Sequence, residues 1–244
     1  MRILAICNQK GGTGKTATAV NLGPALAVLG KKVLLIDLDP QANASYTFDL
    51  NGSAGSIVEV LQGKQTLQAM IVNKEKINII PSHRALADLE LALISKIGRE
   101  MILKRSLAEI HGYDFVIIDC PPSLSILTIA ALAAARELII PLQAEPYSIK
   151  GLTELLATVR EIRREINESL KVLGILFTMY DARRGLSEEV VKAIRDNFKE
   201  RIFKTTIREN VRIAESPSYG QSVLTYAPDS HGAEDYKALA KEIL

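Results

Sequence analysis

A glycine-rich segment of seven residues near the start of the chain, KGGTGKT, constrains the fold more than any other part of the sequence. It spans residues 10–16, follows the apolar run Ile3–Cys7 and precedes the helix-like stretch Thr16–Leu29. A strand, a glycine-rich turn and a helix in this order are the setting that a phosphate-binding loop requires. The glycines let the backbone curl so that successive N–H groups point at phosphate oxygens, and the helix adds the positive end of its dipole. The segment therefore predicts a P-loop fold that binds a nucleotide.

Each part of this loop has an expected task. Lys15 would reach the β- and γ-phosphates, and the Thr16 hydroxyl would be a ligand of Mg²⁺. The general pattern G-x-x-x-x-G-K-[ST], counted back from Gly14, requires glycine at position 9. This chain has Gln9 there, followed by a second lysine, Lys10. The predicted nucleotide-binding residues of the loop are Lys10, Gly11, Gly12, Thr13, Gly14, Lys15, Thr16 and Ala17.

Apolar strand-like runs alternate with amphipathic helical stretches along the chain. The strands are almost continuously apolar, which is typical of strands covered by helices on both faces. We therefore predict an α/β fold with a doubly wound, mostly parallel sheet flanked by helices, in one domain that spans residues 1–244. Residues 202–230 are expected to form an irregular lid or edge, and Gly232–Leu244 a closing helix. The predicted strands are Ile3–Cys7, Val33–Ile36, Ile77–Ile80, Phe115–Ile118, Glu137–Leu142 and Val172–Phe177, and the predicted helices are Thr16–Leu29, Arg84–Lys96, Arg99–His111, Ser125–Ala135, Ser148–Asn167 and Ser187–Lys199.

Acidic residues follow two of the predicted strands. Ligands of doubly wound sheets bind outside the carboxyl ends of the strands, and Asp37, Asp39 and Asp119 fall at that edge. Two carboxylates at positions i and i+2 can serve Mg²⁺ and an attacking water, and a hydrophobic strand that ends in an acid is typical of an aspartate that holds Mg²⁺ through water. The predicted metal ligands are Thr16, Asp37 and Asp119.

Composition sets limits on the class of protein. The net charge of +2 over 244 residues is too small to indicate nucleic-acid binding by itself, so DNA binding would need a local patch or two patches combined in a dimer. Cys7 and Cys120 have no C-x-x-C spacing, and the three histidines form no ligand motif, so no zinc site is predicted. No stretch is long enough for a membrane span and no signal peptide is visible, so we expect a cytoplasmic protein.

Several segments in combination resemble motifs of the ParA/MinD group of P-loop ATPases, and most closely its Soj-type partitioning members. The loop resembles the deviant Walker A pattern K-G-G-x-G-K-[ST]. Residues 37–41 (DLDPQ) resemble the A′ motif D-x-D-P-Q, and residues 119–122 (DCPP) resemble the switch segment D-x-P-P. Thr178–Arg183 and Ile207–Gly220 resemble two further segments of Soj-type proteins. The resemblance covers nearly the whole chain.

The resemblance implies roles for individual residues. Lys10 would reach across a dimer interface to the nucleotide of the other subunit, and Gly11 would let that subunit approach closely. Asp39 would position the hydrolytic water. The implied catalytic residues are Lys10, Lys15 and Asp39, the residues implied at the adenine pocket are Met179 and Asn210, and the implied DNA-contacting residues are Arg183 and Arg212. This chain has Arg208-Glu209-Asn210 where the family usually has Pro-Arg-Asn.

The resemblance also implies a function. ATP and Mg²⁺ would be the cofactors, and the ATP-bound sandwich dimer would bind non-specific DNA and associate with the nucleoid. Hydrolysis, accelerated by a ParB-like centromere-binding protein with a basic N-terminal segment, would release it. No membrane partner is expected, because Gly232–Leu244 carries mixed charges where a membrane-targeting helix has a basic polar face.

Three alternatives remain at this stage. A positioning ATPase for another cargo would share every residue discussed above. A MinD-like membrane ATPase would need an amphipathic anchor. A metabolic P-loop enzyme would need a substrate pocket with acid and base groups of its own.

Overall fold

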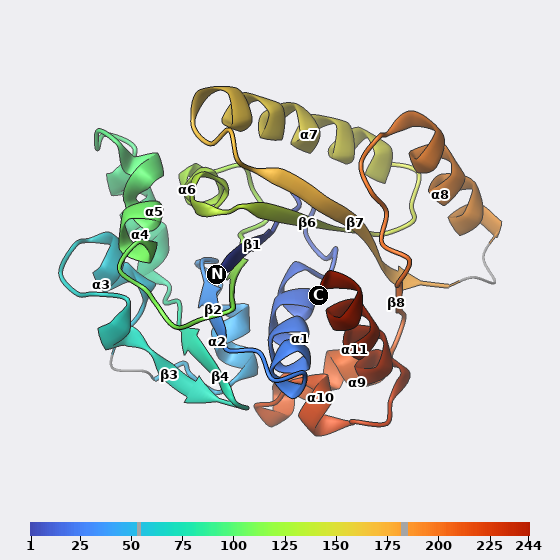
Figure 1. Ribbon diagram of the computed structural model, residues 1–244, viewed down its shortest axis with the longest axis horizontal. Coiled ribbons are helices and arrows are strands. Elements are labelled where there is room, and N and C mark those ends of the chain that lie inside the picture. Colours follow the sequence, from blue (N-terminus) through green and yellow to red (C-terminus); the bar gives the residue numbers. More distant parts are fainter. Residues whose placement is uncertain (53–54, 182–184) are drawn as a thin grey trace.

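The strands form an eight-stranded sheet in the computed structural model, which describes residues 1–52, 55–181 and 185–244 (Figure 1). The strand order is β3-β4-β2-β5-β1-β6-β7-β8. Neighbouring strands are parallel except for β3, which pairs antiparallel with β4 at one edge. The strands are β1 (Arg2–Ile6), β2 (Val33–Asp37), β3 (Val72–Lys74), β4 (Ile77–Ile80), β5 (Phe115–Asp119), β6 (Glu137–Leu142), β7 (Lys171–Tyr180) and β8 (Ile207–Arg208).

Helices connect the parallel strands. In Figure 1, α7 lies along one side of the sheet, and α1 and α11 lie together on the other. The α-helices are α1 (Lys15–Val28), α2 (Asn43–Thr47), α3 (Ile57–Leu61), α4 (Ala85–Leu93), α5 (Ile102–Leu107), α6 (Ile126–Ala134), α7 (Ser148–Glu165), α8 (Gly185–Asn197), α9 (Val211–Glu215), α10 (Val223–Tyr226) and α11 (His231–Ile243). Short 3₁₀ turns are η1 (Gln68–Met70), η2 (Arg99–Met101) and η3 (Ser216–Tyr219).

The central strand β2 sends its side chains alternately into two hydrophobic cores. Leu34 and Ile36 join the core that includes residues of α3 to α8, whereas Val33 and Leu35 join the core under α1 and α11. All four side chains are buried. A strand that is buried on both faces must be apolar at every position, which explains the continuous apolar runs in the sequence. The predicted doubly wound, mostly parallel sheet is confirmed.

The predicted strands and helices are present, with differences where local signals are weak. The strand β3 has three residues and β8 has two, which is too short for a periodic pattern. The predicted helix Arg99–His111 divides into η2 and a shorter α5. Residues 202–230, expected to be irregular, contain β8, η3 and two short helices, α9 and α10.

Candidate nucleotide-binding and catalytic site

The glycine-rich loop connects β1 to α1 in the way the sequence predicts. Gly12 and Gly14 have φ angles of 74° and 79°, in the left-handed region that favours glycine. Gly14 is the N-cap of α1, and a Cβ at this position would lie 3.4 Å from Cγ2 of Thr178. The Thr178 hydroxyl also donates a hydrogen bond to the Thr13 carbonyl at 2.9 Å. The end of β7 therefore supports the loop from the side.

Lys15 begins α1 and is only 5% exposed. Its ammonium donates to the carbonyl of Lys10 at 3.0 Å, so the side chain folds back along the loop. Burial lowers the pKa of Lys15, while the nearby carboxylates of Asp119 and Asp39 act in the opposite direction. A buried ammonium next to a glycine-rich loop at the N-terminus of a helix is suited to an oligophosphate.

Asp37 and Asp119 lie side by side because β2 and β5 pair in register up to their last residues. Both side chains are fully buried. The Asp37 carboxylate accepts hydrogen bonds from the amide and hydroxyl of Ser45, at 2.8 and 2.7 Å, and from the amide of Asp39 at 3.1 Å. Burial raises the pKa of Asp37 to about 6 despite these hydrogen bonds.

Asp119 has no such support. Neither carboxylate oxygen has a hydrogen-bond partner among the described residues. Burial, and then the charge of Asp37, raise the pKa of Asp119 well above its ordinary value, and the nearby Thr16 hydroxyl acts in the opposite direction without meeting hydrogen-bond geometry. An uncompensated buried carboxylate is costly unless a cation accompanies it.

These oxygens fit Mg²⁺ better than a transition metal. Mg²⁺ prefers oxygen ligands and is usually held by one or two carboxylates together with phosphates and water. The described residues contain no group of three His, Cys, Asp or Glu side chains that could hold a metal without phosphate or water ligands. Asp119, Asp37 and the Thr16 hydroxyl are therefore the oxygen donors that could hold Mg²⁺ together with a nucleotide.

Asp39 lies just beyond β2 at the same edge and is 5% exposed. Its carboxylate accepts a hydrogen bond from the Gln41 amide at 2.9 Å, and its carbonyl accepts one from the Ser82 hydroxyl at 2.7 Å. The amide of Ser82 in turn donates to the Ser45 hydroxyl at 2.8 Å. The serines that hold this loop were not predicted, because single serines in loops carry no pattern.

Lys10 forms an ion pair with Glu145, which follows β6. The lysine is 43% exposed and the glutamate 49%. Gln143 donates from Nε2 to the Gly12 carbonyl at 3.2 Å. The sequence patterns did not indicate Glu145 or Gln143, although both follow a predicted strand at the carboxyl edge, where a search for polar residues would have found them.

Comparison with known proteins agrees with this geometry. A family model described as an AAA domain matches residues 1–172. The chain is 41% identical over 255 residues to the sporulation initiation inhibitor protein Soj of Bacillus subtilis, covering 99% of this chain and 98% of that protein. It is 44% identical over 244 residues to the chromosome-partitioning ATPase Soj of Thermus thermophilus, covering 100% and 96%. The chain belongs to the Soj/ParA family of partitioning ATPases.

A solved structure agrees with this membership at the level of the P-loop fold. Cobyrinic acid a,c-diamide synthase from Mycobacterium smegmatis with bound ADP and magnesium is 36% identical and superposes with a TM-score of 0.87. The match covers 99% of this chain and 93% of that one. The resemblance that the motifs indicated is confirmed.

In this Soj/ParA protein, the residues predicted at the adenine pocket lie within or just beyond the carboxyl ends of two paired strands. Met179 near the end of β7 has a φ of 48°, is 43% exposed and receives a hydrogen bond from Gln143 on its sulfur at 2.9 Å. Asn210, two residues beyond β8, caps α9 by accepting from the Arg212 amide at 2.8 Å. Because β7 and β8 are parallel neighbours, the two residues lie at the same edge of the sheet.

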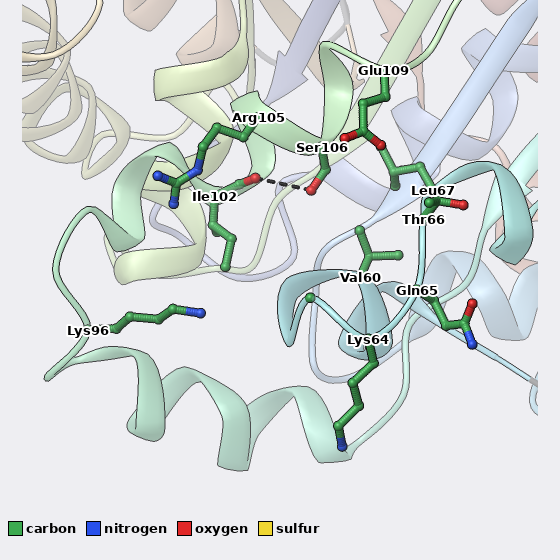
Figure 2. A pocket seen from close by; sticks show the side chains of 11 residues that line it. Val60, Lys64, Gln65, Thr66, Leu67, Lys96, Ile102, Arg105, Ser106 and Glu109 are labelled. Atoms are coloured by element: carbon green, nitrogen blue, oxygen red, sulfur yellow. Dashed lines mark hydrogen bonds between the residues drawn. The ribbon is translucent and has the colours of Figure 1, made fainter.

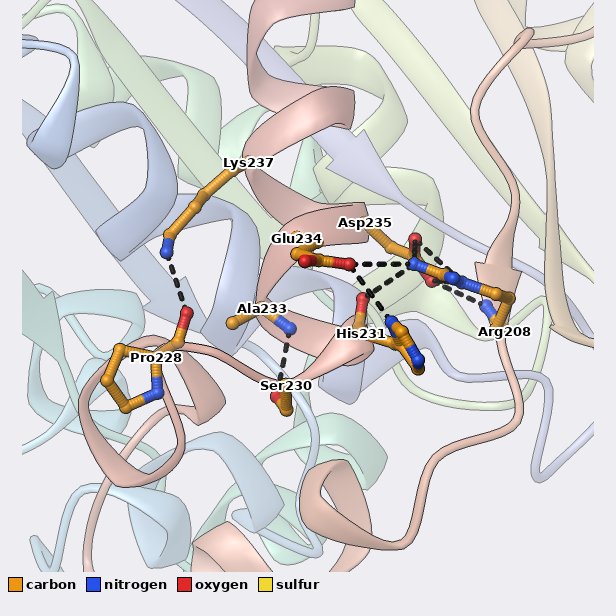
Figure 3. Close-up of polar contacts among 8 residues, drawn as sticks. All are labelled: Arg208, Pro228, Ser230, His231, Ala233, Glu234, Asp235 and Lys237. Atoms are coloured by element: carbon orange, nitrogen blue, oxygen red, sulfur yellow. Dashed lines mark hydrogen bonds and ion pairs between the residues drawn. The ribbon is translucent and has the colours of Figure 1, made fainter.

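Arg208, which stands where the family usually has proline, is tied to α11 (Figure 3). Its guanidinium donates to both carboxylate oxygens of Asp235, at 2.7 to 3.1 Å, and to Glu234 at 3.2 Å. Asp235 is 10% exposed, so the pair is partly buried. Where the family usually has a rigid proline, this chain therefore has an arginine whose ion pair joins β8 to α11.

Of the two arginines predicted to contact DNA, the structure describes only one. Arg183 lies outside the described residues. Arg212 is exposed on α9 and pairs with Glu215 at 2.8 Å. A surface arginine held by one exposed carboxylate remains accessible to a phosphate, because such pairs are weak.

A cavity of about 430 Å³ lies away from the P-loop, between the end of α3 and helix α5 (Figure 2). Its lining residues include Lys64, Lys96, Arg105 and Glu109, and none of the predicted site residues lines it.

No helix in the described part of the chain combines the length and apolar character needed to cross a bilayer.

Proposed function

We propose that this Soj/ParA-family protein is a partitioning ATPase that binds ATP with Mg²⁺, dimerises, binds DNA without sequence preference and releases it after hydrolysis. The observation that carries the proposal is the in-register pair Asp37 and Asp119 beside the glycine-rich loop. The pair provides a metal site that needs a nucleotide to complete it. Full-length similarity to two Soj proteins supplies the biological context.

The loop residues would hold the nucleotide. The N–H groups of residues 10–17 would surround the phosphates, and Lys15 would move from the Lys10 carbonyl to the β- and γ-phosphates. Thr16, Asp37 and Asp119 would hold the metal, directly or through water. Mg²⁺, when bound, neutralises negative charge on the transferring phosphate.

Asp39 would orient the attacking water. Its carboxylate lies beside the metal ligands but has only the Gln41 amide as a hydrogen-bond donor among the described residues, so an oxygen is left to accept from water. The loop amides and Lys15 would stabilise the charge that develops on the phosphate oxygens.

Dimerisation would redirect Lys10. It would leave Glu145 and approach the nucleotide of the second subunit, while the exposed Gly11 would permit close contact. Arg212, and Arg183 beyond the described residues, would then contact DNA phosphates from both subunits. Such binding falls with salt and carries no sequence information. A ParB-like partner would accelerate hydrolysis, and association with the nucleoid would follow the ATP-bound state.

The closing helix argues against membrane binding through α11. Its apolar residues Tyr236, Leu239 and Ile243 are buried in the core shared with α1. A membrane anchor needs such a face free for lipid.

A metabolic role is a second candidate only because of the 36% identity to cobyrinic acid a,c-diamide synthase. Stoichiometric ADP and phosphate without an organic co-substrate would argue against it.

The deciding experiment measures binding to a non-specific DNA duplex with ATP, ADP or no nucleotide, together with the mass in solution. We expect dimer formation and salt-sensitive DNA binding with ATP only. Lys10→Ala should abolish the dimer while sparing some ATP binding, and Asp39→Ala should trap the dimer on DNA. Wild-type hydrolysis by Asp39→Ala would refute the water-positioning role. Dimerisation without DNA binding would refute the DNA step and direct attention to another cargo or surface.

A further inference from the structure

A cavity of about 490 Å³ opens beside the loop that carries Asp39. It lies between the start of α2 and the loop that joins β4 to α4. A smaller hollow of about 170 Å³ continues it and shares Asn51, Ser82 and His83 with it. We call the larger cavity the Ser82 groove. Its side-chain lining includes Gln41, Asn43, Tyr46, Asn51, His83 and Arg84.

The floor of the Ser82 groove is hydrogen-bonded to the catalytic edge. Ser82 is 5% exposed, and its hydroxyl donates to the Asp39 carbonyl at 2.7 Å. Its amide donates to the Ser45 hydroxyl, which donates to the Asp37 carboxylate at 2.7 Å. A displacement of Ser82 therefore alters the support of both acids. No comparable chain of hydrogen bonds among the described residues links these acids to the cavity of Figure 2.

The walls of the Ser82 groove have the chemistry of a polypeptide-binding surface. Three carboxamides, from Gln41, Asn43 and Asn51, can both donate to and accept from a peptide main chain. Tyr46 is 51% exposed, and aromatic side chains of this kind often anchor interfaces.

The charge of the walls indicates what kind of segment they would accept. Arg84 is exposed and makes no ion pair among the described residues, and no Asp or Glu lines the larger cavity. Glu59 lies close to His83 and lines the smaller hollow, not the larger cavity. The complementary segment therefore carries carboxylates. The cavity of Figure 2 is also cationic, with Lys64, Lys96 and Arg105 beside Glu109, but among the described residues it has no such hydrogen-bonded connection to the catalytic acids.

We propose that the Ser82 groove is a docking site for an acidic segment of a partner protein, and that Ser82 transmits its binding to Asp39. The coupling rests on the proposed role of Asp39, whereas the docking does not. The site goes beyond the proposed ParB-like interaction, because that partner is expected to present a basic segment.

Docking is tested with a fluorescein-labelled decapeptide that contains four glutamates and one leucine, and with a matched peptide in which lysines replace the glutamates. We expect the glutamate peptide to bind the full chain, and Arg84→Ala and Tyr46→Ala each to weaken it by about fivefold or more. Lys64→Ala, which removes an exposed cation beside the other cavity, is the matched control and should change affinity by less than about twofold.

Three results would overturn the docking: no measurable binding of the glutamate peptide, equal binding of the lysine peptide, or equal loss in Lys64→Ala and Arg84→Ala. Thermal melting of each variant checks that the chain is folded. Because Arg84→Ala and Tyr46→Ala are separate variants, the test still works if one of them fails to fold.

Coupling is tested by ATP turnover at saturating ATP and peptide. In the wild-type chain we expect kcat to change by about twofold or more, with little change in KM. Ser82→Ala should still bind the peptide but lose this response, and Ser82→Thr, which keeps the hydroxyl, should restore it. An unchanged response in Ser82→Ala, or no response in the wild type, would refute the coupling. Absence of any ATP hydrolysis would refute the proposed function and leave the docking result standing.

Discussion

Lys10 is ion-paired with Glu145 of its own chain, so the lysine expected to act in a second subunit already has a partner. The two residues follow β1 and β6, which are neighbours in the sheet. Removal of this pair should release Lys10 for contact with another subunit. In the proposed dimer, Glu145 and the nucleotide of the second subunit would therefore compete for one ammonium group.

Glu145→Gln should favour the ATP-bound dimer. An exposed ion pair contributes about 0.5 kcal/mol, and a dimer releases one pair from each subunit, so the protein concentration at half-dimerisation should fall by about fivefold. Sedimentation with a slowly hydrolysed ATP analogue measures this shift. Glu165→Gln, which breaks the exposed pair with Arg164, is the control and should leave the midpoint unchanged. A weaker dimer in Glu145→Gln would contradict the proposed competition.

The free energy of unfolding without Mg²⁺ should rise as the pH falls from about 7 to about 5. The pKa of Asp37 is raised to about 6 in the folded chain, so in this range the folded state binds more protons than the unfolded state. Protonation therefore favours folding, by about 1 kcal/mol for this group. Urea unfolding at each pH measures the change, and Asp37→Asn should reduce it. Stability that falls steadily over this range in the wild type would contradict the prediction.

Asp119→Asn should separate stability from activity. The substitution removes a buried charge that has no hydrogen-bond partner among the described residues, so the melting temperature without metal should not fall. Mg²⁺-dependent ATP hydrolysis should drop by about a hundredfold, since a proposed metal ligand is lost. Melting and turnover are measured on the same preparation. A large loss of stability with retained turnover would assign Asp119 a structural role.

Two glycines of the loop should respond differently to alanine. Gly14→Ala introduces a side chain at a φ of 79° and near Thr178, so it should cost about 1–2 kcal/mol of stability and impair ATP binding. A Cβ on Gly11 would meet no described atom within 4 Å, and the φ of Gly11 is not positive, so Gly11→Ala should fold normally and bind ATP. Its defect should appear only in dimer formation. Chemical denaturation, ATP titration and sedimentation distinguish the two.

Arg208 and Arg212 form a matched pair for stability and DNA binding. Arg208→Ala leaves the mostly buried Asp235 carboxylate without its bidentate partner and should destabilise the chain by about 2 kcal/mol. Arg212→Ala breaks only an exposed pair, so stability should change little while DNA affinity falls. Denaturation and DNA titration are compared for both. Lost DNA affinity in Arg208→Ala alone would reverse these assignments.

The sequence was most informative where local pattern and position in the sheet coincide. The loop with Gly14 and Lys15, and the strands that end in Asp37 and Asp119, were predictable because apolar runs and terminal acids are visible in one dimension. Glu145 and Ser82 were not, since their importance depends on which strands become neighbours. The link between Arg208 and Asp235 joins residues 27 positions apart and is a property of the packed chain.

The in-register ends of β2 and β5 divide the site into a fixed part and a movable part. Asp37 and Asp119 belong to central strands with neighbours on both sides, whereas Lys10, Asp39 and Glu145 lie on the connections beyond the sheet. We therefore expect any change of shape between nucleotide states to take place in those connections, while the two acids keep their positions. Slow amide hydrogen exchange in β2 and β5, beside nucleotide-sensitive exchange in the three connections, is the dynamic signature of this division.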